Sequence, residues 1–480
     1  MPTIMSSVRT TAREALACRF RPAISVAPHL TRTLVSFQGN RRVPMMRWFK
    51  FKEGFSESLI RRFLGETGRP DGTLLDPFAG SGTALFTAID EGWDAFGIEV
   101  MPIGRAIAEA RTAAQIVDPA AFVHSVDRVQ QAVWSDAPAF IDLFHKVPIT
   151  AGAFPQQTER DIGGYLSYCR RHVRNSTIRT LLNFACFCVL EEVSFTRKDG
   201  QYLRWDFRSG RVRGTKQFCK GPIPPFREAI TRQLKIMADD IRAARERGGL
   251  FAELSLAGGL DASLDWKEGS CLSMLPEFPS GVVDLVATSP PYCNRYDYTR
   301  TYALELVFLG YDADAIKRLR QTLLSCTVEN RCKRDELAKL YADLGLSHVP
   351  TRVFKVLAEQ RALQEVLTYL EHNRVAGRLN NANIPRMVRN YFLEMCFVIY
   401  ELARVLRPGG RIVMVNDNVR YAGREIPVDL ILSDFAEEFG LNTAKILCLP
   451  RGKGNSSQQM GNHGREELRK GVYYWIKPGL

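Results

Sequence analysis

Apolar residues recur at two different spacings near the start of the chain. Helical spacing predicts a helix that ends near residue 64, and a short apolar run then predicts a buried strand at residues 73–76. A second helix is expected at residues 84–91, and a second strand at residues 95–99. A strand, a helix and a parallel strand in this order form a βαβ unit.

The same alternation returns in the second half of the chain. It predicts a buried strand at residues 282–287, a long amphipathic helix at residues 387–406 and a strand at residues 411–415. The order predicts an open, mostly parallel sheet with helices on both faces. We therefore predict the α/β class, with a doubly wound, Rossmann-like sheet that carries helical and basic insertions.

Two stretches interrupt this pattern. Residues 117–260 lack strand-helix alternation and contain a basic, aromatic stretch, whereas residues from about 310 to 384 are charged and have helical spacing. We therefore predict a catalytic domain built from residues 43–116 and 261–480, with a helical insertion at about 310–384. Residues 117–260 are predicted to be an inserted region.

The first 42 residues are rich in arginine, and Glu14 is their only acidic residue. This composition is similar to that of an organellar transit peptide, but it also suits a basic segment without fixed structure. We favour the second interpretation and predict that residues 1–42 form a basic, mobile N-terminus outside the catalytic domain.

The chain has 480 residues and a net charge of +13. Residues 151–250 hold 19 basic and 10 acidic residues, so much of the excess lies in the inserted region and favours a polyanionic partner. No apolar run is long enough to span a bilayer and no secretory signal is evident, so we expect a cytoplasmic protein without a membrane partner. None of the 11 cysteines forms a C-x-x-C pair, which argues against a metal site.

The first motif with chemical content is Asp76-Pro77-Phe78-Ala79-Gly80-Ser81-Gly82-Thr83, at the predicted strand-to-helix turn. Gly80 and Gly82 remove side chains where a ligand must approach the backbone. A dinucleotide loop would need a third glycine where Leu85 stands, and the lysine of a phosphate loop is absent. Glu99 ends the next strand, where a carboxylate can accept both hydroxyls of a ribose. The alternatives are a tight turn without a ligand and an ordinary surface glutamate.

The second motif, Thr288-Ser289-Pro290-Pro291-Tyr292, ends a predicted strand. The two prolines stiffen the chain and remove two N–H donors, so the exposed polar groups are mostly acceptors. Acceptors on Ser289 and the Pro290 carbonyl suit the exocyclic amine of cytosine or adenine, which must become pyramidal to attack a methyl group. Tyr292 offers a face on which a flipped base can stack. The alternative is a proline-rich turn that closes a strand.

The two motifs resemble those of the amino-directed DNA methyltransferases, which act on cytosine N4 or adenine N6. The resemblance implies a class I methyltransferase sheet, S-adenosyl-L-methionine as the cofactor, and catalytic roles for Ser289, Pro290, Pro291 and Tyr292. The residues that it assigns to the cofactor are Phe55, Asp76, Phe78, Gly80, Gly82, Thr83, Glu99, Ser270 and Cys271.

Serine at position 289 is typical of the cytosine-N4 members of this family, so we predict a site-specific, base-flipping cytosine-N4 DNA methyltransferase. The cofactor motif precedes the catalytic motif by about two hundred residues, an order that leaves adenine N6 or an RNA base open. A cytosine-C5 enzyme would need a Pro-Cys nucleophile, and no Pro-Cys dipeptide occurs. A non-catalytic nucleic-acid-binding protein is a further alternative, and a cognate restriction endonuclease stays open as a partner.

The basic, aromatic stretch at residues 195–220 is the predicted contact with double-stranded DNA, and its location between the two motifs makes residues 117–260 the predicted region of target recognition. Basic side chains can neutralise phosphates, and aromatic rings can stack on bases. The alternative is a solvated β-hairpin whose aromatic residues form its own core. A polar loop at residues 451–469 is expected either to reach DNA or to cover the site. The predicted DNA-binding residues are Arg197, Lys198, Arg204, Arg208, Arg211 and Arg213.

Overall fold

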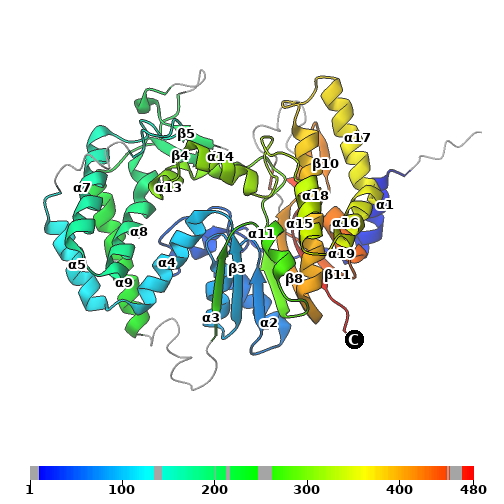
Figure 1. Cartoon of the computed structure of the whole chain (residues 1–480), viewed down its shortest axis with the longest axis horizontal. Helices are drawn as coiled ribbons and strands as arrows, with labels where there is room; N and C mark the ends of the chain where they lie inside the picture. The colour runs from blue at the N-terminus through cyan, green and yellow to red at the C-terminus, as the bar shows by residue number, and fades with distance from the viewer. Residues whose placement is uncertain are drawn as a thin grey trace, which may run out of the picture.

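The computed structural model describes residues 10–134, 143–199, 202–211, 217–246, 262–450, 453–454 and 467–479. Its centre is an eight-stranded sheet with the order β1-β11-β14-β8-β7-β2-β3-β6 and helices on both faces (Figure 1). The strands of this sheet are β1 (Ile24–Val26), β2 (Thr73–Asp76), β3 (Asp94–Glu99), β6 (Leu264–Glu268), β7 (Val283–Thr288), β8 (Leu406–Asp417), β11 (Asn442–Cys448) and β14 (Lys470–Ile476).

Helices make up most of the remaining described residues. The α-helices are α1 (Ala12–Phe20), α2 (Glu57–Thr67), α3 (Thr83–Asp90), α4 (Pro102–Ile116), α5 (Pro119–Gln131), α7 (Gln156–His172), α8 (Ser176–Val193), α9 (Phe226–Glu246), α11 (Cys271–Met274), α12 (Tyr298–Thr301), α13 (Ala303–Phe308), α14 (Ala313–Thr322), α15 (Arg334–Asp343), α16 (His348–Glu359), α17 (Arg361–Val375), α18 (Ile384–Val405) and α19 (Val428–Glu438). Short 3-10 helices are η1 (Arg21–Ala23), η2 (Phe37–Arg42), η3 (Phe207–Ser209) and η4 (Leu275–Glu277). Two-stranded ribbons pair β4 (Thr196–Asp199) with β5 (Tyr202–Trp205), β9 (Val419–Tyr421) with β10 (Arg424–Ile426), and β12 (Lys453–Gly454) with β13 (Glu467–Leu468).

All neighbouring strands of the large sheet run parallel except β14, which is antiparallel to β8 and β11. The strands predicted at residues 73–76, 95–99 and 282–287 are β2, β3 and β7, with bounds that differ by at most one residue. β7 is buried along its whole length, as expected for a parallel strand that is covered on both faces. The predicted doubly wound α/β fold is therefore confirmed.

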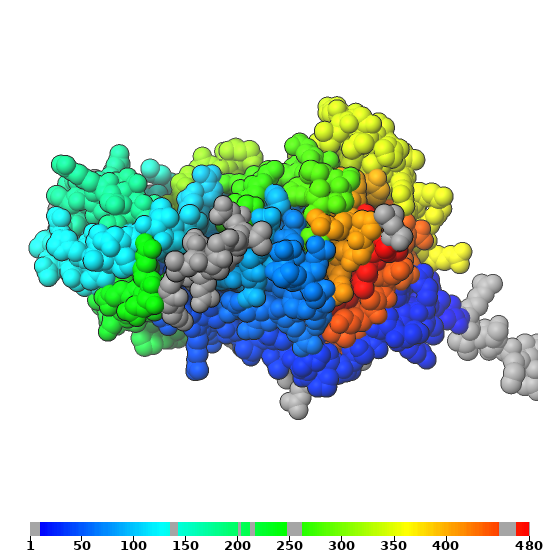
Figure 2. Space-filling view, turned by 90° about the horizontal axis from the view of Figure 1, so that it is seen from below, coloured from blue at the N-terminus to red at the C-terminus, as the bar shows by residue number. Residues whose placement is uncertain are grey.

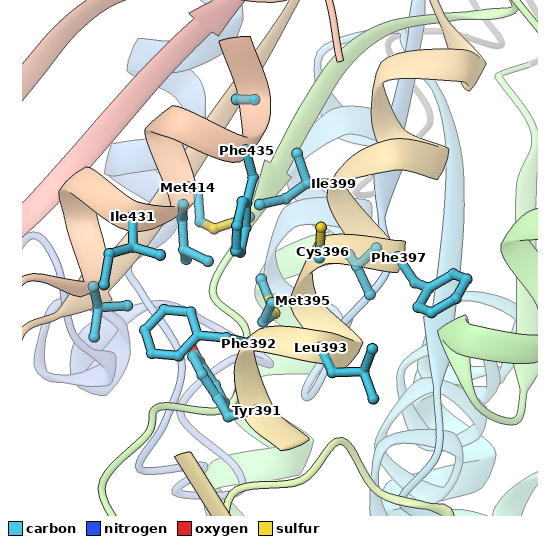
Figure 3. Close-up of a cluster of buried hydrophobic side chains, with 14 of the residues drawn as sticks. Tyr391, Phe392, Leu393, Met395, Cys396, Phe397, Ile399, Met414, Ile431 and Phe435 are labelled. Atoms are coloured by element: carbon cyan, nitrogen blue, oxygen red, sulfur yellow. The ribbon is translucent and has the colours of Figure 1, made fainter. Parts of the chain in front are cut away.

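The two faces of the sheet form separate cores, because side chains alternate along a strand. Met414 of β8 packs with Phe392 of α18 and Phe435 of α19 on one face (Figure 3). The preceding residue, Val413, packs on the other face with residues of α2 such as Leu59. With both faces covered, a ligand reaches the centre of the sheet at the carboxyl ends of the strands.

Helices α4, α5, α7, α8 and α9 form a lobe at one side of the sheet (left in Figure 1). Asp240 of α9 fastens this lobe to the chain before the cofactor motif, since its carboxylate accepts bonds from the Met45 N–H at 2.9 Å and the Trp48 indole at 2.8 Å. Helices α16 and α17 pack against α18 at the other side of the sheet. No helix in the described part of the chain is long and apolar enough to cross a membrane.

The prediction of a mobile N-terminus is wrong for residues 10–42. Helix α1 starts at a reciprocal capping box between Thr11 and Glu14, and Phe20 is buried in the core around α18. Strand β1 then adds a parallel edge to β11. Two of the basic side chains pair with other elements: Arg13 lies 2.9 Å from Glu365 of α17, and Arg19 pairs with Asp434 of α19. Figure 2 shows the N-terminal residues in dark blue on the molecule seen from below.

Candidate active site

The carboxyl ends of β2 and β7 lie side by side where the strand order reverses, which is the usual ligand position in an open α/β sheet. Asp76 ends β2 and is buried. Its Oδ1 accepts hydrogen bonds from the Phe78 N–H at 3.0 Å and the Thr288 hydroxyl at 2.7 Å. One carboxylate thus joins the two motifs. Burial raises the pKa of Asp76 to about 7.

Glu99 ends β3, and its carboxylate points back to the glycine turn. The Gly80 N–H donates to Oε2 at 2.6 Å, and the Met101 N–H donates to Oε1 at 2.6 Å. Gly80 has a φ of 56°, and a Cβ at this position would lie 2.8 Å from the Phe51 ring, so the turn requires glycine here. Burial raises the pKa of Glu99 to about 7.

A pocket lies over these strand ends. The residues predicted to hold the cofactor line this pocket, with Gly82 as the exception. Gly82 instead shapes the turn into α3, with a φ of 73° and the Phe86 and Trp266 rings 3.0 Å from the place of a Cβ. The predicted residues in the lining are Phe55, Asp76, Phe78, Gly80, Thr83, Glu99, Ser270 and Cys271.

The charge of the pocket limits what it can bind. Its lining contains the carboxyl groups of Glu53, Asp76 and Glu99, and none of its described lining residues is Lys, Arg or His. A phosphate-bearing cofactor would be repelled here, because the charged side chains that line the pocket are acidic. A ligand with positive charge would instead be attracted, since opposite charges favour the ionised carboxylates.

The second motif reaches the same pocket. Ser289 and Pro291 line it, whereas Pro290 is buried and Tyr292 lies outside the lining. The Ser289 and Tyr292 hydroxyl oxygens are 3.2 Å apart. Behind Tyr292, the ammonium of Lys470 lies 5.6 Å from the centre of its ring. The catalytic strand end is thus continuous with the acidic pocket.

Comparison with protein-family models gives no match to this chain. The type II methyltransferase M.AvaI of Nostoc sp. is 46% identical over 468 residues, which cover 97% of this chain and 93% of the relative. M.AvaI of Anabaena variabilis gives the same values. The type II methyltransferase M.BsoBI of Geobacillus stearothermophilus is 38% identical over 467 residues, 93% of this chain and 88% of the relative. This chain belongs to the type II methyltransferase family.

The basic hairpin of this methyltransferase consists of β4, β5 and the described residues that follow. Arg197 and Arg204 are exposed, and Arg204 lies over the Phe218 ring at 4.2 Å. Arg208 forms a bidentate pair with Asp206, and Arg211 donates to the Pro148 carbonyl at 2.7 Å. Arg213 and most of the loop at residues 451–469 lie outside the described residues.

The assignment of Lys198 to DNA binding is wrong. Its side chain is buried, and its ammonium lies 2.5 Å from a carboxylate oxygen of Glu305 and 3.7 Å from one of Glu191. The same ammonium lies 4.7 Å from the centre of the Tyr302 ring. Lys198 therefore fastens the hairpin to α13 and α8 from the inside and cannot reach a nucleic acid.

Several residues of the pocket were not predicted from the sequence. Glu53 lies in the segment before α2, and Leu323 and Leu324 come from the chain after α14. Glu53 could have been found from its position in Phe51-Lys52-Glu53-Gly54-Phe55, because it is an acidic residue two positions before Phe55, which was predicted to hold the cofactor. Leu323 and Leu324 could not be found in this way, because two apolar residues after a helix are as typical of the hydrophobic core as of a pocket wall.

Proposed function

We propose that this methyltransferase transfers a methyl group from S-adenosyl-L-methionine to the N4 amine of cytosine in duplex DNA, at a specific site and with the base turned out of the helix. The observation that carries the proposal is the continuous pocket that joins the acidic strand ends to Ser289 and Pro291. A methyl donor bound among the pocket carboxylates would lie beside the Ser289 hydroxyl and the Pro290 carbonyl, which are the hydrogen-bond acceptors of the catalytic strand end. The type II methyltransferase relatives support the reaction class.

The pocket fits the chemistry of this cofactor. S-Adenosyl-L-methionine has a net positive charge near neutral pH, and it supplies a methyl group on a sulfonium whose sulfur leaves as a neutral thioether. Glu99 would accept hydrogen bonds from the ribose hydroxyls, and Ser270 and Cys271 would border the adenine. Asp76 holds the backbone of the glycine turn through its bond from Phe78, which keeps this wall of the pocket in place.

The catalytic strand end would hold the amine through acceptors. The Ser289 hydroxyl and the Pro290 carbonyl can each accept one N–H, and this orientation favours the pyramidal nitrogen that attacks the methyl group. As the nitrogen–carbon bond forms and the sulfur–carbon bond breaks, the nitrogen would lose one proton, which would pass by way of the Ser289 hydroxyl to water. Proline nitrogens at positions 290 and 291 carry no hydrogen, so no backbone donor competes for the amine lone pair. Tyr292 would stack on the flipped base.

Contact with DNA would come from the basic hairpin. Arg197 and Arg204 present exposed guanidinium groups on β4 and β5, and such groups neutralise phosphates. The hairpin belongs to the lobe that Asp240 fastens to the segment entering the pocket. Strand β5 of the hairpin contacts α12, which contributes Tyr298 to the pocket, so DNA bound on the hairpin would lie beside the active site.

A labelling assay tests the proposed reaction. Purified enzyme, tritiated S-adenosyl-L-methionine and duplex DNA should give labelled DNA, and Ser289→Ala should lower the rate by about 100-fold or more with cofactor binding unchanged. The proposal fails if no DNA is labelled by an enzyme that binds the cofactor normally. Label in RNA but not in DNA would show that RNA is the substrate, whereas the methyl-transfer reaction would stand as proposed.

A further inference from the structure

Lys470 lies beside the catalytic strand end, and the proposed methyl transfer gives it no role. It is the first residue of β14, and its side chain is largely buried. Its ammonium lies 5.6 Å from the centre of the Tyr292 ring and is a hydrogen-bond partner of the Tyr292 hydroxyl. A hydrogen bond to the hydroxyl does not occupy a ring face, so this contact is compatible with stacking of Tyr292 on a base.

Asp417 fixes the position of this ammonium. It ends β8 and stands opposite Lys470 in the antiparallel pairing of β8 with β14. Its Oδ1 lies 3.5 Å from the Lys470 ammonium, is buried, and has no hydrogen bond within the described part of the chain. A buried carboxylate needs a nearby positive charge to offset its lost hydration, so the pair holds the ammonium against the sheet.

The chemistry of the lysine sets the direction of the hydrogen bonds that follow. An ammonium can only donate, so the Tyr292 oxygen accepts from Lys470. Tyr292 is then left to donate its own hydrogen across the 3.2 Å that separates its oxygen from the Ser289 oxygen. A serine oxygen can accept twice, so Ser289 keeps one lone pair for the amine, and its own hydrogen stays free to leave.

We propose that Lys470 is a positioning residue for methyl transfer, which acts through Tyr292 to orient the Ser289 hydroxyl toward the substrate amine. This inference rests on the proposed function, because it takes Ser289 as the acceptor of the amine. In this orientation the Ser289 oxygen takes the proton that the amine loses, while its own proton passes to water. Without the ammonium, the Tyr292 and Ser289 hydroxyls could exchange donor and acceptor roles, and fewer bound amines would be correctly held.

A double-mutant cycle on the rate of tritium transfer to duplex DNA tests this role. Lys470→Met should lower kcat by at least about tenfold, while the Kd of S-adenosyl-L-methionine changes by less than about twofold. Tyr292→Phe keeps the stacking ring, loses the hydroxyl and should lower kcat by a similar factor. In the double variant, the lysine substitution should cost less than about twofold beyond Tyr292→Phe, because both changes act through one hydroxyl.

The matched control is Lys445→Met on β11. Lys445 also lies beside a tyrosine, with its ammonium 4.0 Å from the centre of the Tyr474 ring, and it also pairs with a carboxylate at 3.5 Å, that of Glu66. None of these three residues lines the pocket. The control should therefore keep kcat within about twofold of the wild-type value.

The outcomes separate the inference from the proposed function. If the wild-type enzyme labels no DNA, the proposed function fails and the inference falls with it. If the wild-type enzyme labels DNA, the inference alone is overturned when Lys470→Met or Tyr292→Phe is as fast, or when the two losses multiply in the double variant. If Lys470→Met does not fold, Lys470→Met combined with Asp417→Asn removes both charges and should show the same loss of kcat. An unchanged kcat in that variant also overturns the inference.

Discussion

Asp76 and Glu99 show what burial does to a single acidic residue. Each carboxyl group has a pKa raised to about 7 by burial, against about 4 in an unfolded chain. The folded protein therefore holds protons that the unfolded chain has released between about pH 4 and about pH 7. Stability contributed by these groups is present below about pH 4 and is lost as the pH rises through that range. At neutral pH a cationic ligand restores this stability, because it pairs with the ionised carboxylates of Asp76 and Glu99.

Cofactor affinity should therefore increase with pH. Between about pH 6 and about pH 8, S-adenosyl-L-methionine should bind about tenfold more tightly for each of the two groups that ionises on binding. The same binding should release protons at about pH 6, which calorimetry in buffers of different ionisation enthalpy measures directly. Affinity that stays flat or falls as the pH rises would show that neither carboxyl group loses a proton when the cofactor binds.

At the scale of secondary structure elements, the central strands could be predicted because both of their faces are covered. β2, β3 and β7 form near-continuous apolar runs that end in polar motifs, so the sequence predicted both the strands and the edge at which they meet. Strand β1 could not be predicted in this way. It has three residues, and its pairing with β11 joins segments that are far apart in the chain.

The role of a charged side chain depended on partners that the sequence does not reveal. Lys198 has the same type of sequence context as Arg197, yet it points inward to Glu305, which is 107 residues away in the chain. In a strand, successive side chains point to opposite faces, and which face is buried is set by the surrounding fold. The pocket residues of the two motifs were easier to predict, because each motif lies at a strand end.

The exposed arginines of the hairpin give a prediction at this scale. The double substitution Arg197→Gln and Arg204→Gln should weaken binding of duplex DNA of any sequence and reduce the salt slope of binding by about two, because each phosphate contact contributes about one. Fluorescence anisotropy at several salt concentrations measures both quantities.

The control for this experiment is Arg242→Gln. Arg242 lies on α9 of the same lobe but outside the hairpin, so its loss should leave the salt slope unchanged. An unchanged slope in the hairpin variant as well would mean that DNA is bound by another surface.

On the scale of the whole molecule, the sheet lies between two helical regions. The lobe of α4, α5, α7, α8 and α9 stands at one side, and α16 and α17 stand at the other (Figure 1). The N-terminal residues extend the same sheet at its edge, and α1 packs against α17 and α19. The catalytic unit of the protein therefore includes residues 10–42 as part of its core, in addition to the motifs.

Removal of a buried N-terminal side chain should destabilise the whole enzyme. Phe20→Ala should lower the free energy of unfolding by about 3 kcal/mol, because Phe20 is buried in the core around α18. Urea denaturation followed by circular dichroism measures this change. Val26→Ala, at an exposed position of β1, should cost less than about 0.5 kcal/mol. Equal effects of the two substitutions would show that the N-terminal segment is not part of the core.

Identification of the methylated nucleoside is the most direct test of the central claim, that an exocyclic amine of DNA accepts the methyl group. Duplex DNA treated with the enzyme and S-adenosyl-L-methionine is digested to nucleosides and separated by liquid chromatography with mass detection. The account predicts N4-methyldeoxycytidine in the sample with wild-type enzyme and its loss with Ser289→Ala. N6-methyldeoxyadenosine would keep the reaction but correct the base. 5-Methyldeoxycytidine, or no methylated nucleoside from an enzyme that binds the cofactor, would contradict the account.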